Sequence, residues 1–408
     1  MDISTQTGYD LFSQEALFNP LPLYERLRRE DPVHFSEAGG FWFLTRYRDV
    51  TAALRDIRLS SDRKALYTSQ LGGLDPSLTQ NFFKLMDRWM IEKDPPDHTV
   101  LRKIANRGFT ARALESWAPI IQKTTDELLD AVQEKRVMDI VADLSTKLPS
   151  WIIAEIFGVP VEAREKLIQW AIPIATLWGG AATEDIAEVA KEADTGANAF
   201  VAFLNQVIQE RRRQPGTDMI SLLTVAYEEH GFPLENLPAL CILLLNAGHV
   251  TSADIIPNGL NALLRHPDQL QKLKDNPNLI NSAVDEILRF DSSVPVLFRI
   301  AKEDLTIGGK RIRAGSVVAL GMAAANHDPE KFDSPEVFDI TRSPNEHLGF
   351  GLGAHFCPGA ILARMELATC YSTLLRRFPN LRLDPANSPV PRRTSLAFKG
   401  FASFPIVF

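Results

Sequence analysis

The chain has 408 residues, of which 45% are hydrophobic and 23% charged, a composition typical of globular proteins with a large core. The formal net charge of −7 argues against nucleic acid as the main partner. Three unevenly placed cysteines do not make a disulfide framework, and the N-terminal residues show neither a signal-peptide core nor a spanning run. We therefore expect a cytoplasmic protein without a membrane anchor.

Helical periodicity dominates the first half of the chain. A helix is predicted over 20–30, and another over 45–56 follows a short strand-like segment, GGFWFLT. Residues 62–94 are rich in turn-forming and aromatic residues, which predicts a surface excursion of a length that is usually functional. Helix then follows helix from 98 to 211.

The second half contains one long apolar run, ENLPALCILLLNAGHVTSADIIPNGLNALLRHP, at 235–267. It predicts a buried helix, which Pro257 is expected to kink because proline lacks the N–H that the helix needs. Another helix follows, and then short strands up to the C-terminus. No repeat, low-complexity tract or compositional boundary interrupts the chain. We therefore predict a single domain over 1–408, mainly α with a small β part.

The stretch GFGLGAHFCPG at 349–359 places Cys357 in a glycine-rich loop just before a helical pattern. The N–H groups and dipole at a helix N-terminus stabilise a thiolate, so the loop is expected to present a charged sulfur. Cys241 and Cys370 lie in apolar helical runs and are expected to be buried as small hydrophobic residues.

The chemistry of Cys357 has several alternatives. His355 is near in sequence, but side chains two residues apart on an extended loop diverge, which disfavours a Cys–His nucleophile. One cysteine cannot hold zinc or an iron–sulfur cluster, whereas a lone thiolate suits haem iron as an axial ligand. A redox-sensing cysteine on a helical scaffold without haem remains the alternative.

The pattern Phe350-x-x-Gly353-x-x-x-Cys357-x-Gly359 resembles the haem-binding loop of the cytochrome P450 family. Two further segments resemble motifs of that family in the same order. Glu286-Ile287-Leu288-Arg289 is similar to its ExxR motif, and Ala247-Gly248-His249-Val250-Thr251 to its oxygen-binding helix motif.

The resemblance covers essentially the whole chain and points to the soluble bacterial branch. It implies a cytochrome P450 fold in which haem b (iron protoporphyrin IX) lies between the long central helix and the cysteine loop. Cys357 is then the metal ligand, and Phe350, Gly353 and Gly359 shape the cofactor-binding loop.

Glu286 and Arg289 lie one helical turn apart, close enough to form an ion pair. The resemblance implies that this structural pair is buried and braces the loop behind the haem. The family's third partner is often an arginine, but its position here is Val337. We therefore expect the pair to use another partner, such as a backbone carbonyl.

The two propionates of haem call for cations or other donors when they are buried. The resemblance assigns this role to four basic residues, which are His98, Arg102, Arg299 and His355.

Gly248 and Thr251 lie inside the long helix, where glycine costs about 1 kcal/mol relative to alanine. Thr251 can bond back to the carbonyl of Ala247, but the resemblance implies that it helps deliver protons to dioxygen. The family's usual acid just before this threonine is replaced by Val250, which carries no proton. Thr251 and Ser252 with water, His249, or a polar group of the substrate remain as routes. The predicted catalytic residues are Ala247, Gly248, Thr251 and Ser252.

The substrate pocket is predicted to be mostly apolar, as small-molecule sites usually are. Its predicted residues are Trp89, Asn246, Val294, Val296, Leu297, Leu396 and Phe398.

These features predict a haem-thiolate monooxygenase that inserts one oxygen atom of O2 into a hydrophobic small molecule, by hydroxylation or epoxidation, in secondary metabolism. Electrons are expected from a separate ferredoxin with its reductase or from a flavoprotein, and the protein is expected to be a monomer. Val250 motivates an alternative, a peroxide-driven oxygenase or a nitrogen-oxide reductase. A non-catalytic haem sensor is a further alternative, against which Gly248-x-x-Thr251 argues.

Overall fold

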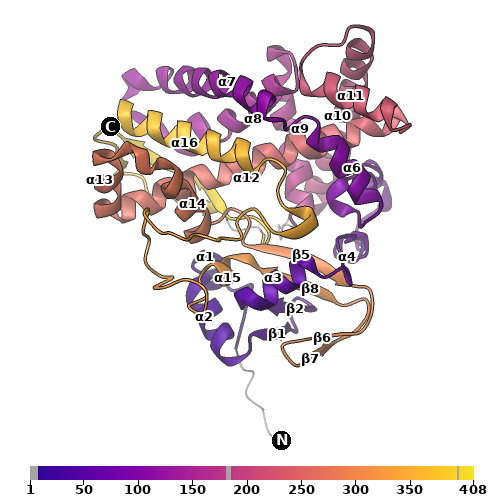
Figure 1. Cartoon of the computed structure of the whole chain (residues 1–408), viewed down its shortest axis with the longest axis horizontal. Coiled ribbons are helices and arrows are strands. Elements are labelled where there is room, and N and C mark those ends of the chain that lie inside the picture. The colour runs from indigo at the N-terminus through magenta and orange to yellow at the C-terminus, as the bar shows by residue number, and fades with distance from the viewer. Residues whose placement is uncertain (1–7, 181–184, 393–394) are drawn as a thin grey trace, which may run out of the picture.

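The structure is a computed structural model that describes residues 8–180, 185–392 and 395–408. Residues 181–184, which fall in the helical stretch predicted for 98–211, lie outside the described residues. Helices fill one side of the molecule and the largest sheet lies on the other, next to the first helices of the chain (Figure 1). The predicted mainly α fold with a small β part is confirmed.

The described helices have the following bounds: α1 Gln14–Phe18, α2 Leu21–Glu30, α3 Tyr47–Arg55, α4 Lys64–Gln70, α5 Gln80–Met86, α6 Asp97–Asn106, α7 Ala111–Asp130, α8 Lys147–Ile156, α9 Arg164–Trp178, α10 Ile186–Arg213, α11 Met219–Glu229, α12 Leu237–Arg265, α13 Pro267–Asp275, α14 Ile280–Phe290, α15 Met322–Asn326 and α16 Ala360–Arg377. The excursion predicted for 62–94 contains α4 and α5 with short 3-10 turns, among them η2, Met90–Glu92.

The long helix α12 crosses the centre of the helical side (Figure 1). It is the one helix of the described residues that is long and apolar enough to cross a membrane, but 72% of its apolar window is buried inside the protein. Its apolar surface therefore serves the core, where it packs against α8, α10 and α14. The helix continues across Pro257 up to Arg265.

The largest sheet has five strands in the order β1-β2-β8-β5-β3. The described strands are β1 Val33–Ser36, β2 Phe41–Leu44, β3 Leu59–Ser60, β4 Val137–Asp139, β5 Val296–Ala301, β6 Leu305–Ile307, β7 Lys310–Ile312, β8 Val317–Gly321, β9 Arg382–Leu383, β10 Val390–Arg392, β11 Gly400–Ser403 and β12 Pro405–Val407. Strand β5 pairs antiparallel with the central strand β8, and Arg299 lies opposite Val318. This pairing fixes which face of β5 each side chain occupies.

The ion pair predicted from ExxR is formed and fully buried: Glu286 and Arg289 are both 0% exposed. Arg289 donates two hydrogen bonds of 2.8 Å to the Glu286 carboxylate. It also donates to the carbonyl of Val337 at 3.1 Å, so the expected backbone partner exists.

The prediction that no second arginine joins the pair of Glu286 and Arg289 was wrong. Arg342, five residues beyond Val337, places its Nε 3.1 Å from Glu286 Oε2 and also donates to the carbonyl of Val337. The sequence spacing misplaced this partner because a turn brings it back to the helix. A buried carboxylate shared by two arginines has the charge compensation that burial demands.

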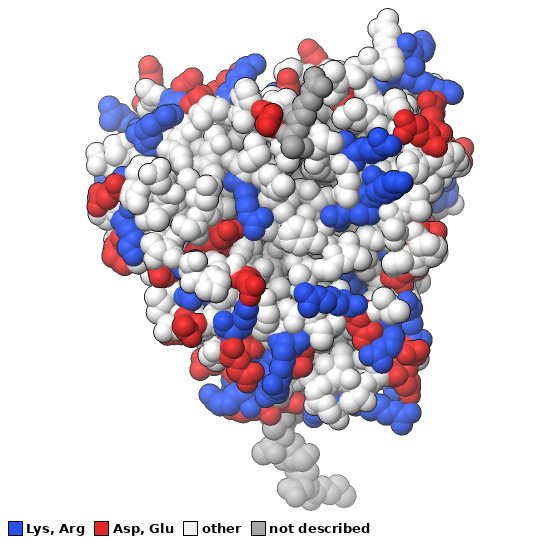
Figure 2. Space-filling view, in the orientation of Figure 1, with Lys and Arg blue, Asp and Glu red and all other residues white. Residues whose placement is uncertain are grey.

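Lysine, arginine, aspartate and glutamate side chains are mixed over the face of the molecule shown in Figure 2, and neither sign covers it.

Candidate functional site

The loop before α16 has the backbone that its glycines predict. Gly351 and Gly353 adopt positive φ angles of 69° and 77°, a region that favours glycine. A Cβ at Gly353 would lie only 3.0 Å from the carbonyl oxygen of Leu54, so the loop also needs glycine to approach α3. The Cys357 N–H donates to the carbonyl of Phe350 at 2.9 Å, which closes the loop on itself.

The protonation of Cys357 differs from the expectation. Burial raises the pKa of its thiol, and the Gly359 N–H, Arg102 and Arg364 offset this only in part. The Gly359 N–H at the helix N-terminus therefore lowers this pKa, but by less than burial raises it. A bound metal cation would favour the deprotonated sulfur, as cations do for coordinated thiols.

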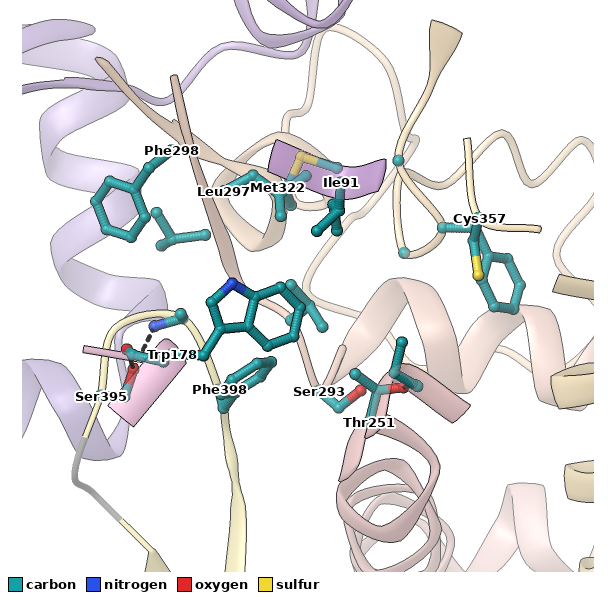
Figure 3. Close-up of a pocket in the computed structure, with 18 of the residues that line it drawn as sticks. Ile91, Trp178, Thr251, Ser293, Leu297, Phe298, Met322, Cys357, Ser395 and Phe398 are labelled. Carbon is teal, nitrogen blue, oxygen red and sulfur yellow. Dashed lines mark hydrogen bonds between the residues drawn. The ribbon is translucent and has the colours of Figure 1, made fainter. Parts of the chain in front are cut away.

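Cys357 faces a cavity of about 520 Å³ that separates the loop from α12. Figure 3 shows Thr251 on α12 and Cys357 on the opposite side of this space, with Trp178 and Phe398 further along it. Most of the predicted site residues line the cavity. They are Ala247, Gly248, Thr251, Ser252, Val294, Val296, Leu297, Arg299, Phe350, His355, Cys357, Gly359, Leu396 and Phe398.

Two predicted pocket residues do not line the cavity. Trp89 is fully buried and contacts Trp178 edge to face with ring centroids 5.3 Å apart, so it backs the wall instead of forming it. Asn246 is 1% exposed and precedes Ala247 on α12. One residue along a helix turns the side chain by about 100°, which takes it away from the cavity face.

Of the four basic residues predicted to hold propionates, Arg299 and His355 line the cavity, and His98 and Arg102 lie close to them. His98 and His355 stack their rings with centroids 3.9 Å apart. Burial lowers the pKa of both imidazoles, that of His355 to about 3, so both are neutral near pH 7. Arg102 lies close enough to Cys357 for an electrostatic interaction between the two side chains. Arg299 lies on β5 and is 6% exposed.

These four residues fit the edge of a haem that carries the two propionates. His98 Nε2 is buried without a hydrogen-bond partner, an arrangement that natural proteins rarely leave unexplained. Arg299 donates from Nη1 to the carbonyl of Phe298, and the described contacts give it no carboxylate. Arg102 and Arg299 together supply two positive charges, which match two propionates.

The face of α12 toward Cys357 is shaped by Gly248 and Thr251. Thr251 Oγ1 donates to the carbonyl of Ala247 at 2.9 Å, so the local helix bond considered for this residue is present. A Cβ at Gly248 would lie 3.3 Å from Cδ1 of Ile153, a tight contact. Glycine thus lets α8 and α12 approach each other beside the threonine.

A buried acid that the sequence reasoning missed lies in the same cavity. Glu366 on α16 is 2% exposed and lines the cavity together with Ser252. Burial raises the pKa of its carboxyl to about 8, while a hydrogen bond with Ser252 lowers it in part. Its Oε1 has no hydrogen-bond partner. The sequence signal for this buried acid was a glutamate within the apolar helical pattern of ILARMELATC.

His249, one of the proton routes considered, is turned away from the cavity. Its Nε2 contacts the carbonyl oxygen of Thr146 at 3.1 Å, and it is absent from the cavity wall. Burial lowers the pKa of His249 to about 4, so the ring is neutral near pH 7.

Comparisons with known proteins agree with this geometry. The family model of cytochrome P450 matches residues 73–399. The biotin biosynthesis cytochrome P450 of Bacillus subtilis (strain 168) is 40% identical over 414 residues, covering 100% of both chains. The vitamin D(3) 25-hydroxylase of Pseudonocardia autotrophica is 37% identical and covers 98% of both. The crystal structure of P450BioI with hexadec-9Z-enoic acid ligated acyl carrier protein has a TM-score of 0.88 at 37% identity, covering 97% of this chain and 100% of that one.

Proposed function

Because the chain belongs to the cytochrome P450 family, a haem b monooxygenase family, we propose that it inserts one oxygen atom of O2 into a long-chain hydrophobic acyl substrate. The observation that carries this proposal is the position of Cys357 and Thr251 on opposite sides of one cavity. The cavity wall away from Cys357 is mostly apolar, which suits an acyl chain. The relative crystallised with an acylated carrier protein supports this substrate class.

When bound, haem b supplies the redox chemistry that activates dioxygen and oxidises the substrate. In this chain Cys357 Sγ would bind the haem iron. Arg102 and Arg299 would neutralise the propionates, with His98 Nε2 as a further donor. Leu297 and Phe398 would orient the substrate and exclude water from the cavity.

Glu366 and Ser252 would hold and move the proton that Val250 does not provide. The Glu366 carboxyl, protonated below pH 8, gives its proton to Ser252 Oγ while the Ser252 O–H proton passes into the cavity toward Thr251. Glu366 is left as a carboxylate, and a proton from bulk solvent, relayed through water that enters the cavity, restores the carboxyl. A general acid with a pKa near the working pH is well suited to this role.

The peroxide-driven and nitrogen-oxide alternatives are not favoured. These alternatives were suggested by the lack of an acid at position 250. Glu366 supplies an acid that lines the same cavity. The named relatives include a hydroxylase. The family uses O2 with an electron donor, which we propose is a separate ferredoxin system or flavoprotein.

The test is turnover of methyl palmitate by the haem-loaded protein with NAD(P)H, a ferredoxin and its reductase under 18O2. Hydroxylated product carrying one labelled oxygen is expected. Product formed with hydrogen peroxide alone at an equal or higher rate, with no label from 18O2, would support the peroxide-driven alternative instead. Absence of any product from acyl substrates would refute the acyl assignment.

A further inference from the structure

A buried ion pair lies at the cavity wall: Arg63 lines the cavity near Arg299 and His355, and Glu92 lies behind it. Arg63, the residue before α4, contacts Glu92 in η2 through two nitrogens, and its Nε lies 3.0 Å from Glu92 Oε2. Trp178, at the end of α9, donates from Nε1 to Glu92 Oε1 at 3.1 Å. Three segments far apart in the sequence thus meet at one carboxylate.

This pair is held deep in the protein. Arg63 is 6% exposed and Glu92 4% exposed, and Arg63 lines the cavity. Burial alone lowers the pKa of Arg63, but the charge and hydrogen bonds of Glu92 outweigh burial and raise it above its usual value. Arg63 therefore remains charged, and its charge is already compensated.

The neighbouring cation, Arg299, is already assigned to a haem propionate. Burial, and after it the nearby Arg63, lower the pKa of Arg299 to about 10, so the two guanidinium groups are close enough to repel. Among the described residues that line the cavity, these two are the only lysines or arginines. With Arg299 assigned to a propionate and Arg63 to Glu92, the described wall offers no spare positive charge.

Resting on the proposed function, we propose that Glu92 sets the substrate class: the acyl group enters this cavity as a neutral ester, thioester or amide, and the free carboxylate is excluded. A carboxylate beside Arg63 would place two anions on one cation in a site shielded from water. A buried, uncompensated charge is costly, whereas a neutral carbonyl can accept a hydrogen bond from Arg63 without adding charge.

The test compares two matched ligands, palmitic acid and its methyl ester, on the haem-loaded protein. Dissociation constants are measured by the change in the haem spin-state spectrum and by isothermal titration calorimetry. The wild-type protein is expected to bind the ester at least about tenfold more tightly than the acid at pH 8. The Glu92→Gln variant leaves Arg63 unpaired, so its acid-to-ester ratio is expected to move by about tenfold or more toward the acid.

Two further variants separate charge from structure. Asp87→Asn removes an exposed carboxylate of the same excursion, paired with Lys64, and is expected to leave the ratio unchanged. The double variant Arg63→Met with Glu92→Met removes both charges and is expected to keep the wild-type preference for the ester. It also serves as the second arm if Glu92→Gln fails to bind haem.

Equal binding of acid and ester by the wild-type protein would overturn the inference. So would a Glu92→Gln variant whose ratio matches that of Asp87→Asn, because a merely structural role of Glu92 changes both affinities together. Failure of both ligands to bind any haem-loaded variant would refute the acyl assignment itself, and this inference with it. That result differs from a preserved ester affinity with an unmoved ratio, which leaves the proposed function intact.

Discussion

Arg342 Nε lies 3.1 Å from Glu286 Oε2, so one buried carboxylate is shared by two arginines from different parts of the chain. The second is Arg289, one helical turn along α14. The pair and its partner tie α14 to the segment that leads into the cysteine loop.

Replacing Arg342 by methionine is expected to lower the free energy of unfolding by about 3 kcal/mol, because Glu286 would lose part of its charge compensation in a dry site. Equilibrium unfolding in urea measures this change. Arg212→Met, which removes an exposed pair with Glu228, is the matched control and is expected to cost less than about 1 kcal/mol. Similar losses in the two variants would show that the buried network contributes no more than a surface pair.

Cys357→Ser is expected to abolish the absorption band of the reduced, carbon-monoxide-bound protein that a thiolate ligand produces, because the serine oxygen does not replace the thiolate. Cys370→Ala, which removes a buried thiol outside the cavity, should leave the band in place. An unaltered band in Cys357→Ser would refute the assignment of the ligand.

Glu366→Gln is expected to divert electrons from product to peroxide or water by about tenfold or more, because the carboxyl that holds the proton is gone. Product formed per NAD(P)H consumed measures the coupling. An independent readout is the infrared C=O absorption of protonated carboxylic acids at pH 7, part of which should be lost in Glu366→Gln. If the variant loses no intensity relative to wild type, Glu366 is not a protonated acid.

The raised pKa of Glu366 also predicts how stability depends on pH. Burial raises this pKa from 4.5 to about 8, so the folded protein holds the proton more tightly than the unfolded chain. Its contribution to stability is fully present below pH 4.5 and is lost as the pH rises toward 8 and beyond. Wild type should therefore lose a few kcal/mol more than Glu366→Gln between about pH 5 and pH 9. Parallel pH profiles of unfolding free energy in the two proteins would contradict this.

Val250→Asp is expected to leave the O2-dependent rate within about twofold of wild type if Glu366 supplies the proton. Steady-state turnover with saturating redox partner checks this. A large gain in rate would show that the missing acid on α12 limits turnover and that Glu366 does not replace it.

The parts of the site that the sequence predicted are those carried by local patterns. Cys357, Thr251 and the pair Glu286 and Arg289 each lie in a short motif whose spacing is set by one loop or one helix. The long helix was recognisable because its apolar run exceeds any strand.

The parts that were missed depend on contacts between distant segments. Arg342 reaches Glu286 across 56 residues, and Glu92 meets Arg63 and Trp178 only when three segments converge. Neither contact leaves a periodic signal. Trp89 was misplaced for a related reason: an aromatic residue in the correct segment can form the wall or support it from behind, and only packing decides which.

The cavity wall draws on residues from almost the whole length of the chain, from Phe12 to Phe398. A ribosome delivers these segments in order, so the cavity is incomplete until Leu396 and Phe398 have been added. A truncation that removes Leu396 and Phe398 would leave a bound haem exposed to water, although Cys357 and the four basic residues would still be present.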